Sequence, residues 1–433
     1  MSSGDVTPSS AVSVELGSGT MFWPGGVEPV LPDGALQVLL RVHGYPIGMF
    51  RADAGGGAQL LESAREFASA HLRQELLEHL SGDGPTEGED LLTLASTLAC
   101  RRPLDAHEGP RPLVTVTLPT IGAVAHTVET VRRVLDSPYT NLEVVVVENA
   151  RRAGGLESAL VAEFPGRPVR YFHEPQPGVS FARNRGAREA RGEIVVFTDD
   201  DVIPDPTWIP AIVRTFTEHP EAACVTGAIL PFATQTPAQA WLEQYGGYNK
   251  GFAEQVFDRH EHARPTPLYP YDAGQFGSGA NMSIRRGRLK AIGPFAMELG
   301  GGTPAGSGED LEMLGRIVIS GLQLVYQPAA LVWHQHPADY PTLRRKMYRY
   351  GAGLSATVTR WCIRDPATAV AIALRLPAGV RHVFGPGSRK NRGKRNDFPK
   401  DLTRRERLGI AAGPVLYVVS VLVMRRRSAR RGA

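Results

Sequence analysis

From residue 113 onward, short runs of branched and apolar residues alternate with longer amphipathic stretches. Such alternation is typical of repeated βα units, which build a parallel sheet flanked by helices. The run Val144-Val145-Val146-Val147 is continuous rather than alternating, as expected of a strand that helices cover on both faces. The expected strands are 113–118, 142–147, 169–173, 194–198, 222–230 and 323–326, and the expected helices are 124–136, 155–163, 179–191 and 206–218. The fold class is therefore α/β with a mostly parallel sheet.

Polar residues follow three of these strands at the point where each strand ends. They are Pro119 and Thr120, then Glu148 and Asn149, and then Asp199, Asp200 and Asp201. The carboxyl ends of parallel strands meet at one edge of a sheet, and ligands of open α/β sheets bind beyond that edge. We therefore expect these residues, although distant in sequence, to converge on one crevice.

The aspartate triplet is the most informative of these groups. Three adjacent carboxylates repel one another unless a cation or hydrogen-bond donors occupy the place. Mg²⁺ and Mn²⁺ accept one or two carboxylates and take other ligands from water and phosphate. Asp199 and Asp201 can therefore hold a diphosphate through one ion while Asp200 points elsewhere. The alternative is an aspartate-rich turn or helix cap before Pro204 and Pro206.

Two glycine-containing segments are further candidates for ligand contact. The stretch 178–186 opens the helix before the aspartate strand and contains Arg183 and Asn184. The amino end of such a helix can receive a pyrophosphate, although a plain surface helix fits equally well. The loop 277–281 consists of small residues, including Gly279 and Asn281, and lets a substrate approach the backbone closely unless it is only a turn.

Acidic and imidazole side chains complete the set of candidates. Glu309 and Asp310 open an apolar helix, where a carboxylate is either a helix cap or, if it faces the aspartate crevice, a general base. His334 and His336 follow a short strand, and a neutral imidazole can complete a metal shell that aspartates begin. We expect at most one of these histidines to be a ligand, with a structural role as the alternative.

Together these segments resemble the family 2 glycosyltransferases of GT-A fold, and the resemblance extends from about residue 110 to residue 340. The matching segments, in the family's order, are Val114-Thr115-Val116 with Pro119-Thr120, Val146-Val147-Glu148-Asn149, Pro177-Gly178 through Gly186, Gly192-Glu193-Ile194 with Thr198-Asp199-Asp200-Asp201, Gly279-Ala280-Asn281-Met282, and Gly308-Glu309-Asp310. The resemblance implies a Rossmann-like, mostly parallel sheet flanked by helices. It also implies an inverting displacement, in which a base deprotonates the acceptor hydroxyl as the metal-bound nucleoside diphosphate departs.

The resemblance implies a role for each matching residue. Asp310 is the catalytic base, and Asp199, Asp201 and His334 hold Mg²⁺ or Mn²⁺. The donor-binding residues are Pro119, Thr120, Glu148, Asn149, Arg183, Asn184, Asp199 and Asp200, and the residues on the acceptor side are Gly279, Asn281 and Glu309. The implied partners are a nucleotide-sugar donor and a glycan or lipid-linked acceptor. Glu148 stands where the family usually has Asp, which leaves the identity of the nucleoside open.

The chain divides into five segments of different composition. They are a disordered tail at 1–20, a small α+β module at 21–100, a linker at 101–112, the α/β domain at 113–345 and a basic and apolar helical region at 346–433. In the module, two strands surround the turn His43-Gly44-Tyr45-Pro46, and a helix is expected at 59–80. Nothing in the module has catalytic spacing, so we expect a docking or stabilising role.

Positive charge is concentrated near the carboxyl end. Residues 389–431 contain 14 Lys or Arg against three acidic residues, although the whole chain carries a formal charge of only +4. The apolar run 408–424 is short for a spanning helix and is interrupted by Pro414, and a second apolar stretch ends at Pro377. We expect an interfacial or re-entrant helix that binds an anionic membrane surface, peripheral or monotopic at the cytoplasmic face, and no nucleic-acid partner. The alternative is a buried helix of a soluble protein.

The three cysteines are Cys100, Cys224 and Cys362. They are far apart and lack the paired spacing of a zinc site or a disulfide framework. This pattern favours a reducing compartment.

Two other functions are compatible with the predicted sheet and its aspartates. A sugar nucleotidyltransferase needs a basic, glycine-rich loop after the first strand, whereas residues 120–125 include no Lys or Arg. A non-catalytic scaffold at the membrane is the second alternative. The retained Asp310 argues against it.

Overall fold

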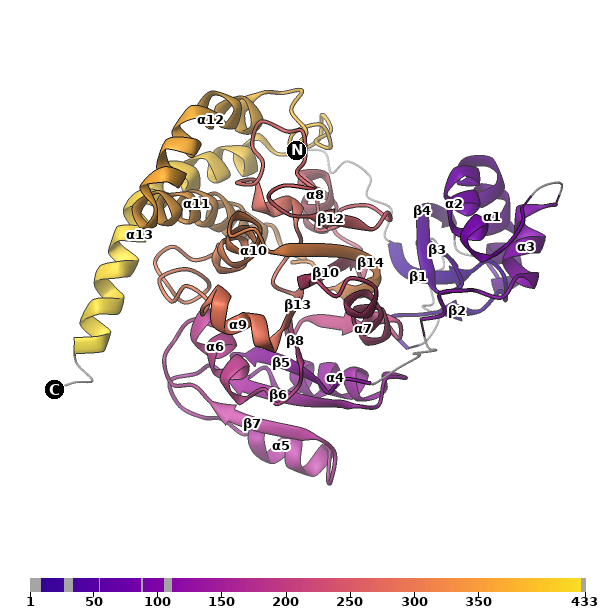
Figure 1. Cartoon of the computed structure of the whole chain (residues 1–433), viewed down its shortest axis with the longest axis horizontal. Coiled ribbons are helices and arrows are strands. Elements are labelled where there is room, and N and C mark those ends of the chain that lie inside the picture. Colours follow the sequence, from indigo (N-terminus) through magenta and orange to yellow (C-terminus); the bar gives the residue numbers. More distant parts are fainter. Residues whose placement is uncertain (1–8, 27–33, 54, 87–88, 105–110, 430–433) are drawn as a thin grey trace.

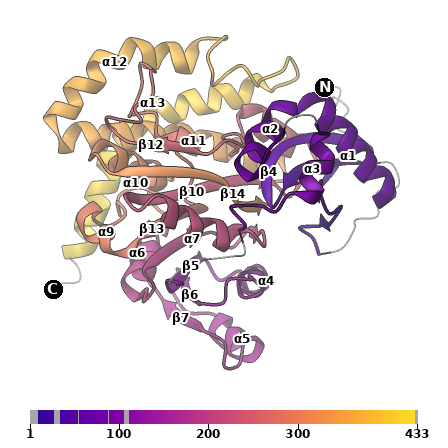
Figure 2. The same ribbon diagram turned by 45° about the vertical axis from the view of Figure 1, so that its right-hand side comes forward.

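The computed structural model describes residues 9–26, 34–53, 55–86, 89–104 and 111–429 (Figure 1). Residues 1–8 of the expected tail and 105–110 of the expected linker lie outside this part of the chain. Within the described residues, the strands form one sheet of nine strands and one of five. Figures 1 and 2 show the larger sheet at the centre, the smaller sheet to one side and three long carboxyl-terminal helices gathered at one end.

Mostly parallel strands build the nine-stranded sheet. Its order is β12-β14-β10-β13-β8-β5-β6-β7, and β9 pairs with β14. The strands are β5 (Val114–Thr120), β6 (Leu142–Glu148), β7 (Val169–His173), β8 (Ile194–Thr198), β9 (Val202–Pro204), β10 (Ala222–Pro231), β12 (Gln255–Phe257), β13 (Asn281–Arg285) and β14 (Gln323–His334). The block β8-β5-β6-β7 is parallel throughout, as is β10 with β14, whereas β13 runs antiparallel between β8 and β10. The prediction of a mostly parallel sheet is confirmed.

Helices cover both faces of this sheet. They are α4 (Val124–Leu135), α5 (Leu156–Glu163), α6 (Val179–Glu189), α7 (Trp208–Glu218), α8 (Pro237–Tyr245), α9 (Arg286–Ile292) and α10 (Glu309–Ile319), with a 3₁₀ turn η1 (Ala273–Gln275). Val144 and Val146 belong to the core under α4, α5 and α7, whereas Val145 and Val147 pack with Ala182 of α6 on the opposite face. Both sets are buried, which explains why the valine run is continuous.

The five-stranded sheet has the order β11-β1-β3-β4, and β2 pairs with β1. Its elements are β1 (Ser9–Glu15), β2 (Met21–Phe22), β3 (Ala35–Val42), β4 (Tyr45–Asp53) and β11 (Ala233–Thr234), followed by the helices α1 (Gly57–His71), α2 (Arg73–Asp83) and α3 (Leu91–Thr97). The hairpin that turns at His43 and Gly44 is confirmed. The single helix expected at 59–80 is wrong, because the backbone leaves helical geometry at Leu72, whose side chain packs closely over Gly48.

The disordered tail expected at 1–20 is wrong for the residues that the structure describes. Ser9–Glu15 forms β1, which pairs in parallel with β3 and antiparallel with β11. Val12 and Val14 point into the core of the module and are fully buried. The apolar alternation is too short to predict a strand, and its pairing partners lie far away in the sequence. The module therefore begins at β1 and not at residue 21.

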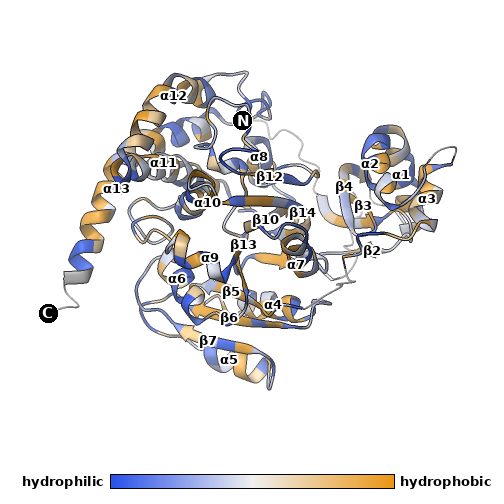
Figure 3. Cartoon of the chain, viewed as in Figure 1, coloured by the Kyte–Doolittle hydropathy of each residue, from blue (hydrophilic) through white to orange (hydrophobic). Residues whose placement is uncertain are grey.

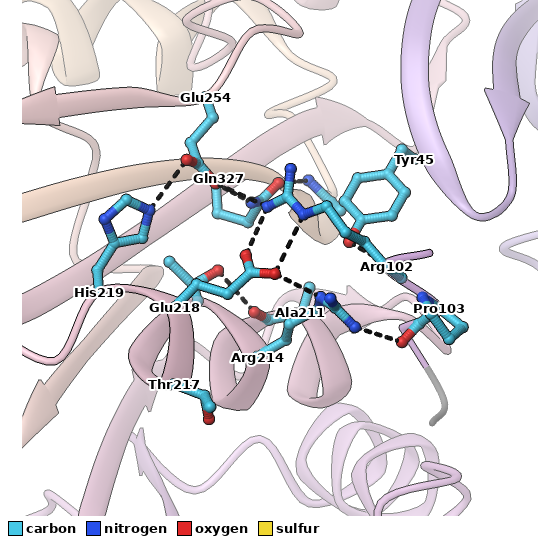
Figure 4. Close-up of polar contacts among 12 residues, drawn as sticks. Tyr45, Arg102, Pro103, Ala211, Arg214, Thr217, Glu218, His219, Glu254 and Gln327 are labelled. Atoms are coloured by element: carbon cyan, nitrogen blue, oxygen red, sulfur yellow. Dashed lines mark hydrogen bonds and ion pairs between the residues drawn. The ribbon is translucent and has the colours of Figure 1, made fainter. Parts of the chain in front are cut away.

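Polar contacts join this module to the α/β domain. Arg41 of β3 forms an ion pair with Asp205 at 2.5 Å, and both side chains are buried. Figure 4 shows a second contact, in which the Arg102 guanidinium forms an ion pair with Glu218 of α7 at 2.5 Å. The same guanidinium lies over the ring of Tyr45, the first residue of β4. The module is thus held against the α/β domain by charges as well as by the β1–β11 pairing.

Three long helices follow the α/β domain, namely α11 (Tyr340–Arg364), α12 (Pro366–Phe384) and α13 (Lys400–Ala429). The boundary expected between residues 345 and 346 is wrong, because α11 begins at Tyr340 and runs through it. The helices α12 and α13 continue through Pro377 and Pro414, the prolines that break the two apolar runs of the sequence. A proline removes one helical hydrogen bond, and tertiary packing can offset that loss.

Hydrophobic residues are frequent along α12 and α13 (Figure 3), and several of their side chains are exposed. Leu374 is 77% exposed and Val415 is 66% exposed. By length and composition alone, Pro366–Phe384 and Lys400–Arg427 could each cross a membrane, with mean hydropathies of 1.2 and 1.9 and only 6% and 22% of the apolar window buried. This exposure distinguishes them from α4 and α7, which turn their apolar faces into the core.

Candidate active site

The ends of β5 and β8 meet in space, as the parallel register requires. Thr117 is aligned with Phe197, so the ends of the two strands reach the same edge of the sheet. There the Thr120 hydroxyl donates to the Asp200 carboxylate at 2.5 Å. Burial raises the pKa of Asp200, and the neighbouring Asp201 and Asp199 add to the effect while Thr120 opposes it. The Asp200 carboxylate is therefore directed towards Thr120 at the end of β5.

Arg183 of α6 joins Asp199 to Glu309. One guanidinium nitrogen lies 2.9 Å from the Asp199 carboxylate and the other lies 2.7 Å from that of Glu309. The Arg183 side chain is only 3% exposed. Burial raises the pKa of Glu309 to about 7, helped by the charge of Asp310 and opposed by that of Arg183. The guanidinium of Arg183 is thus buried between two carboxylates, and its predicted contact with a donor stays a prediction.

Asp201 lies on the other side of the triplet and faces His334 at the end of β14. The Asp201 carboxylate and the His334 Nε2 atom are 3.6 Å apart, and the aspartate side chain is 41% exposed whereas the histidine is buried. Burial and the charge of Lys346 hold the pKa of His334 well below its usual range, so the imidazole is neutral. His336 instead pairs with Glu243 at 2.7 Å.

The residues proposed for metal binding fit a divalent cation. Asp201 offers an accessible carboxylate and His334 offers a neutral imidazole aimed at it, while Asp199 is close enough to His334 to influence its pKa. Two carboxylates and one imidazole suit Mn²⁺, and carboxylates with water and phosphate suit Mg²⁺. The ligand atoms of Asp199, Asp201 and His334 lie farther apart than those of a second group of potential metal ligands, in the amino-terminal module.

Asp310 begins α10 next to the same guanidinium. Its carboxylate accepts the backbone N–H of Gly279 at 3.0 Å and that of Leu311 at 2.8 Å. A Cβ atom on Gly279 would lie 2.8 Å from the Arg183 guanidinium and 2.9 Å from the Asp310 Cβ. Because glycine has no side chain, Arg183 and Asp310 can approach each other here. The buried Tyr248 hydroxyl feels the charges of both Asp310 and Asp201. The predicted convergence of distant acidic side chains is therefore observed.

Two of the amides predicted to bind a ligand form hydrogen bonds inside the protein. Asn281 is buried, donates to the carbonyls of Ala228 and Ala330 and accepts the indole N–H of Trp208. Asn184 donates to the Phe295 carbonyl and accepts the Phe295 N–H. An amide whose donor and acceptor are both satisfied inside the protein fixes the surrounding loops and strands instead of a substrate.

The second expected strand end is also occupied by internal contacts. Glu148 accepts the Tyr171 hydroxyl at 2.5 Å and the Gly154 N–H at 2.9 Å. Asn149 accepts the N–H of Gly178 and donates to two carbonyls of the same loop. Pro119 is buried in β5 opposite Val147. Asn149 and Pro119 are thus held by internal contacts, and their predicted contacts with a donor stay predictions.

A pocket of about 250 Å³ opens beside the acidic residues. Its lining includes Glu309 and three cations of α11, namely Arg345, Lys346 and Arg349. The sequence shows a basic and aromatic run at 343–350, but it gives no reason to place that run beside the aspartates. The indication that the sequence does give is the spacing of four between Arg345 and Arg349, which puts both side chains on one face of a helix.

Comparison with known proteins follows the same part of the chain. Residues 110–353 match the model of a family described as "Glycosyltransferase like family 2". A glucosyl-dolichyl phosphate glucuronosyltransferase of Haloferax volcanii is 27% identical over 179 residues, which cover 40% of this chain and 51% of that protein. A pre-mycofactocin glycosyltransferase of Mycobacterium tuberculosis is 26% identical over 251 residues, covering 57% of this chain and 48% of that protein. The chain thus spans about half the length of these relatives.

Among solved structures, the mannosyltransferase PcManGT from Pyrobaculum calidifontis, in complex with GDP-Man and Mn²⁺, is 19% identical with a TM-score of 0.44. The match covers 72% of this chain and 88% of that one. The family match extends over more than half of the chain and includes the aspartate triplet, Arg183, Asp310 and His334. The chain therefore belongs to glycosyltransferase-like family 2.

Proposed function

We propose that the protein is a metal-dependent, inverting glycosyltransferase that transfers a sugar from a nucleoside diphosphate donor to a hydroxyl of a cell-envelope, polysaccharide or lipid-linked acceptor. The observation that carries this proposal is the position of Arg183, which is buried between Asp199 and Glu309 and touches the site of Asp310. This bridge holds the acidic end of β8 and the start of α10 in one cluster. Family membership supports the reaction type.

Each acidic residue has a separate task in this proposal. Asp310 accepts the proton of the attacking hydroxyl, since its side chain is half-buried, accessible and fixed by the Gly279 N–H. Asp199, Asp201 and His334 hold Mg²⁺ or Mn²⁺, which when bound stabilises the charge of the departing diphosphate. Asp200, fixed by Thr120, faces the nucleoside side of the crevice with Glu148.

The surroundings of the pocket support an acceptor that carries an anionic group. Arg345, Lys346 and Arg349 line it together with Glu309, and Lys346 also lies over the Tyr248 and Tyr350 rings. Three cations that line a pocket together with Glu309, the neighbour of the proposed base Asp310, suit a phosphate-bearing acceptor with a free hydroxyl. The exposed apolar residues of α12 and α13 favour a lipid-linked one, taken from the cytoplasmic face of a membrane.

Donor hydrolysis tests the proposed reaction. We expect the purified full chain to hydrolyse one member of a panel of nucleotide sugars slowly in the presence of Mn²⁺ or Mg²⁺ and to lose this activity in Asp201→Ala. Asp136→Ala is the matched control, because Asp136 is an exposed aspartate at the end of α4. Failure of every donor to bind with either metal would overturn the proposal. Pyrophosphate release from a nucleoside triphosphate would instead indicate a sugar nucleotidyltransferase.

A further inference from the structure

Four potential metal ligands meet in the amino-terminal module, far from the aspartate triplet. They are His43 in the β3–β4 turn, His79 and Asp83 on α2, and Cys100 after α3, and their ligand atoms all lie within 4.8 Å of one another. His43 Nδ1 is 3.1 Å from His79 Nε2 and 2.9 Å from Asp83 Oδ2, and His79 Nε2 is 3.5 Å from the same carboxylate oxygen. Asp83 is buried and the other three side chains are partly buried.

The hydrogen bonds around the cluster turn lone pairs towards its centre. The His43 Nε2 atom faces the Ala95 carbonyl oxygen at 3.2 Å, and because that oxygen can only accept, the proton of a neutral ring resides on Nε2. His43 Nδ1 then presents a lone pair towards the Asp83 carboxylate and the His79 ring. The second Asp83 oxygen accepts the Arg101 N–H at 2.7 Å. Backbone partners of this kind orient metal ligands in proteins.

The backbone at His43 is held in an uncommon conformation. Among the non-glycine residues that the structure describes, His43 is the one with a positive φ, at 54°. The Glu15 carboxylate of β1 accepts the N–H groups of His43 and Gly44 at 2.7 and 2.9 Å and so fixes the turn. Such conformations persist where the surroundings impose them and concentrate at functional sites. This turn aims the imidazole at α2.

We propose that His43, His79, Asp83 and Cys100 bind a structural Zn²⁺ ion. Two imidazoles, a carboxylate and a thiolate are zinc ligands, and four protein ligands leave no open position, as in structural sites. Ligand bonds of about 2.0–2.1 Å in a tetrahedron separate nitrogen and oxygen ligands by about 3.3 Å, close to the separations given above. No two cysteines are close in the sequence, so this site cannot be predicted from cysteine spacing; the His79–Asp83 spacing of four on one helix is the available signal.

The position of the proposed zinc site indicates what a bound ion would stabilise. Cys100 comes two residues before Arg102, which pairs with Glu218 of α7 and lies over Tyr45, the second residue after His43 (Figure 4). The Tyr45 hydroxyl also donates to the Arg102 carbonyl at 2.8 Å. A bound ion would therefore fasten the start of the linker to the module at the place where the module meets the α/β domain.

Metal content of the purified full chain tests the proposal. After dialysis against a weak chelator that removes loosely held Mg²⁺ and Mn²⁺, we expect one equivalent of zinc per chain in the wild type and in Asp201→Ala, and its loss in Cys100→Ser and His79→Ala. Cys362→Ser is the matched control, because Cys362 is a partly buried cysteine on α11. A wild-type chain without zinc, or variants that keep it, would overturn the proposal.

Cobalt substitution keeps the test independent of how well the variants fold. Wild-type protein stripped of metal and refilled with Co²⁺ should show the ligand-field bands of a tetrahedral ion and a thiolate-to-cobalt charge-transfer band. A metal-free pair between protonated His43 and Asp83 is the competing explanation. It predicts no such bands and a melting temperature that strong chelators and added Zn²⁺ leave unchanged, and that result contradicts the proposal.

Discussion

Arg183 donates to the Asp199 carboxylate at 2.9 Å from a position almost completely inside the protein. A buried guanidinium needs compensating charge, and Glu309 supplies the second carboxylate at 2.7 Å. The cost of burying these charges is offset only while all three groups are present. The Arg183 bridge therefore fixes the position of the aspartate triplet. The free energy of unfolding also depends on this bridge.

Arg183→Met should destabilise the fold and abolish donor binding together. The change leaves two carboxylates without their cation, and removal of one partner from a buried ion pair costs about 3–5 kcal/mol. Urea denaturation measures the loss, and Arg185→Met is the control, since Arg185 pairs with Glu189 at the half-exposed surface of the same helix. A loss in Arg183→Met no greater than in the control would show that the bridge contributes little.

Stability should fall as the pH rises towards neutrality because of Glu309. Burial raises its pKa from 4.5 to about 7, so the folded state binds a proton that the unfolded state releases. This contribution is fully present below about pH 4.5 and is lost as the pH rises through about 7, with a slope of at most about 1.4 kcal/mol per pH unit. Denaturation midpoints measured across this range should decline in the wild type. The Glu309→Gln variant should remove this decline, and an equal slope in both proteins contradicts the assignment.

Asp310→Asn should lower kcat by about 10²–10⁴ while the donor still binds. The amide cannot accept the proton of the attacking hydroxyl, but its oxygen can still accept the Gly279 N–H. Donor affinity by calorimetry and turnover with acceptor separate the two effects. Asp339→Asn serves as the control because Asp339 caps α11 at the surface. Unchanged turnover in Asp310→Asn would exclude Asp310 as the base.

Local pattern predicts six of the nine strands of the larger sheet and misses the short antiparallel strands β9, β12 and β13. Strands 169–173 and 194–198 coincide with β7 and β8, because buried runs bounded by turns are a local property of the sequence. The strand β1 could not be predicted in this way, since its partners β3 and β11 are brought to it only by the fold. Long-range pairing, and not propensity, decides such short elements.

The acidic site, like the sheet, could be predicted from the sequence only in part. Asp199, Asp201 and Asp310 could be predicted because strand ends and helix starts converge in an open α/β sheet. Asn184 and Asn281 could not be distinguished from ligand-binding amides, because their partners are backbone groups of Phe295 and of β10 and β14. Sequence shows which side chains can form hydrogen bonds, and only the fold shows which are already satisfied.

Arg349→Gln should raise the KM for an anionic acceptor and leave the donor affinity unchanged. Arg349 lines the pocket on the α11 side. A charge-assisted hydrogen bond is worth about 1.5–3 kcal/mol, so we expect KM to rise about 10- to 100-fold. Arg288→Gln is the control, because Arg288 is an exposed arginine of α9. The same KM in Arg349→Gln and the wild type would argue against an anionic group on the acceptor.

Charge placed on the exposed apolar faces of α12 and α13 should release the protein from membranes. The double variant Leu374→Glu and Val415→Glu introduces carboxylates at side chains that are 77% and 66% exposed, so the fold should survive while insertion among acyl chains becomes costly. Flotation with vesicles that contain an anionic phospholipid measures binding. Val161→Glu is the control because Val161 is 69% exposed on α5, at the end of the molecule away from α12. If the double variant floats as the wild type does, these helices are not the membrane-binding surface, and the basic residues between them remain to account for any attachment.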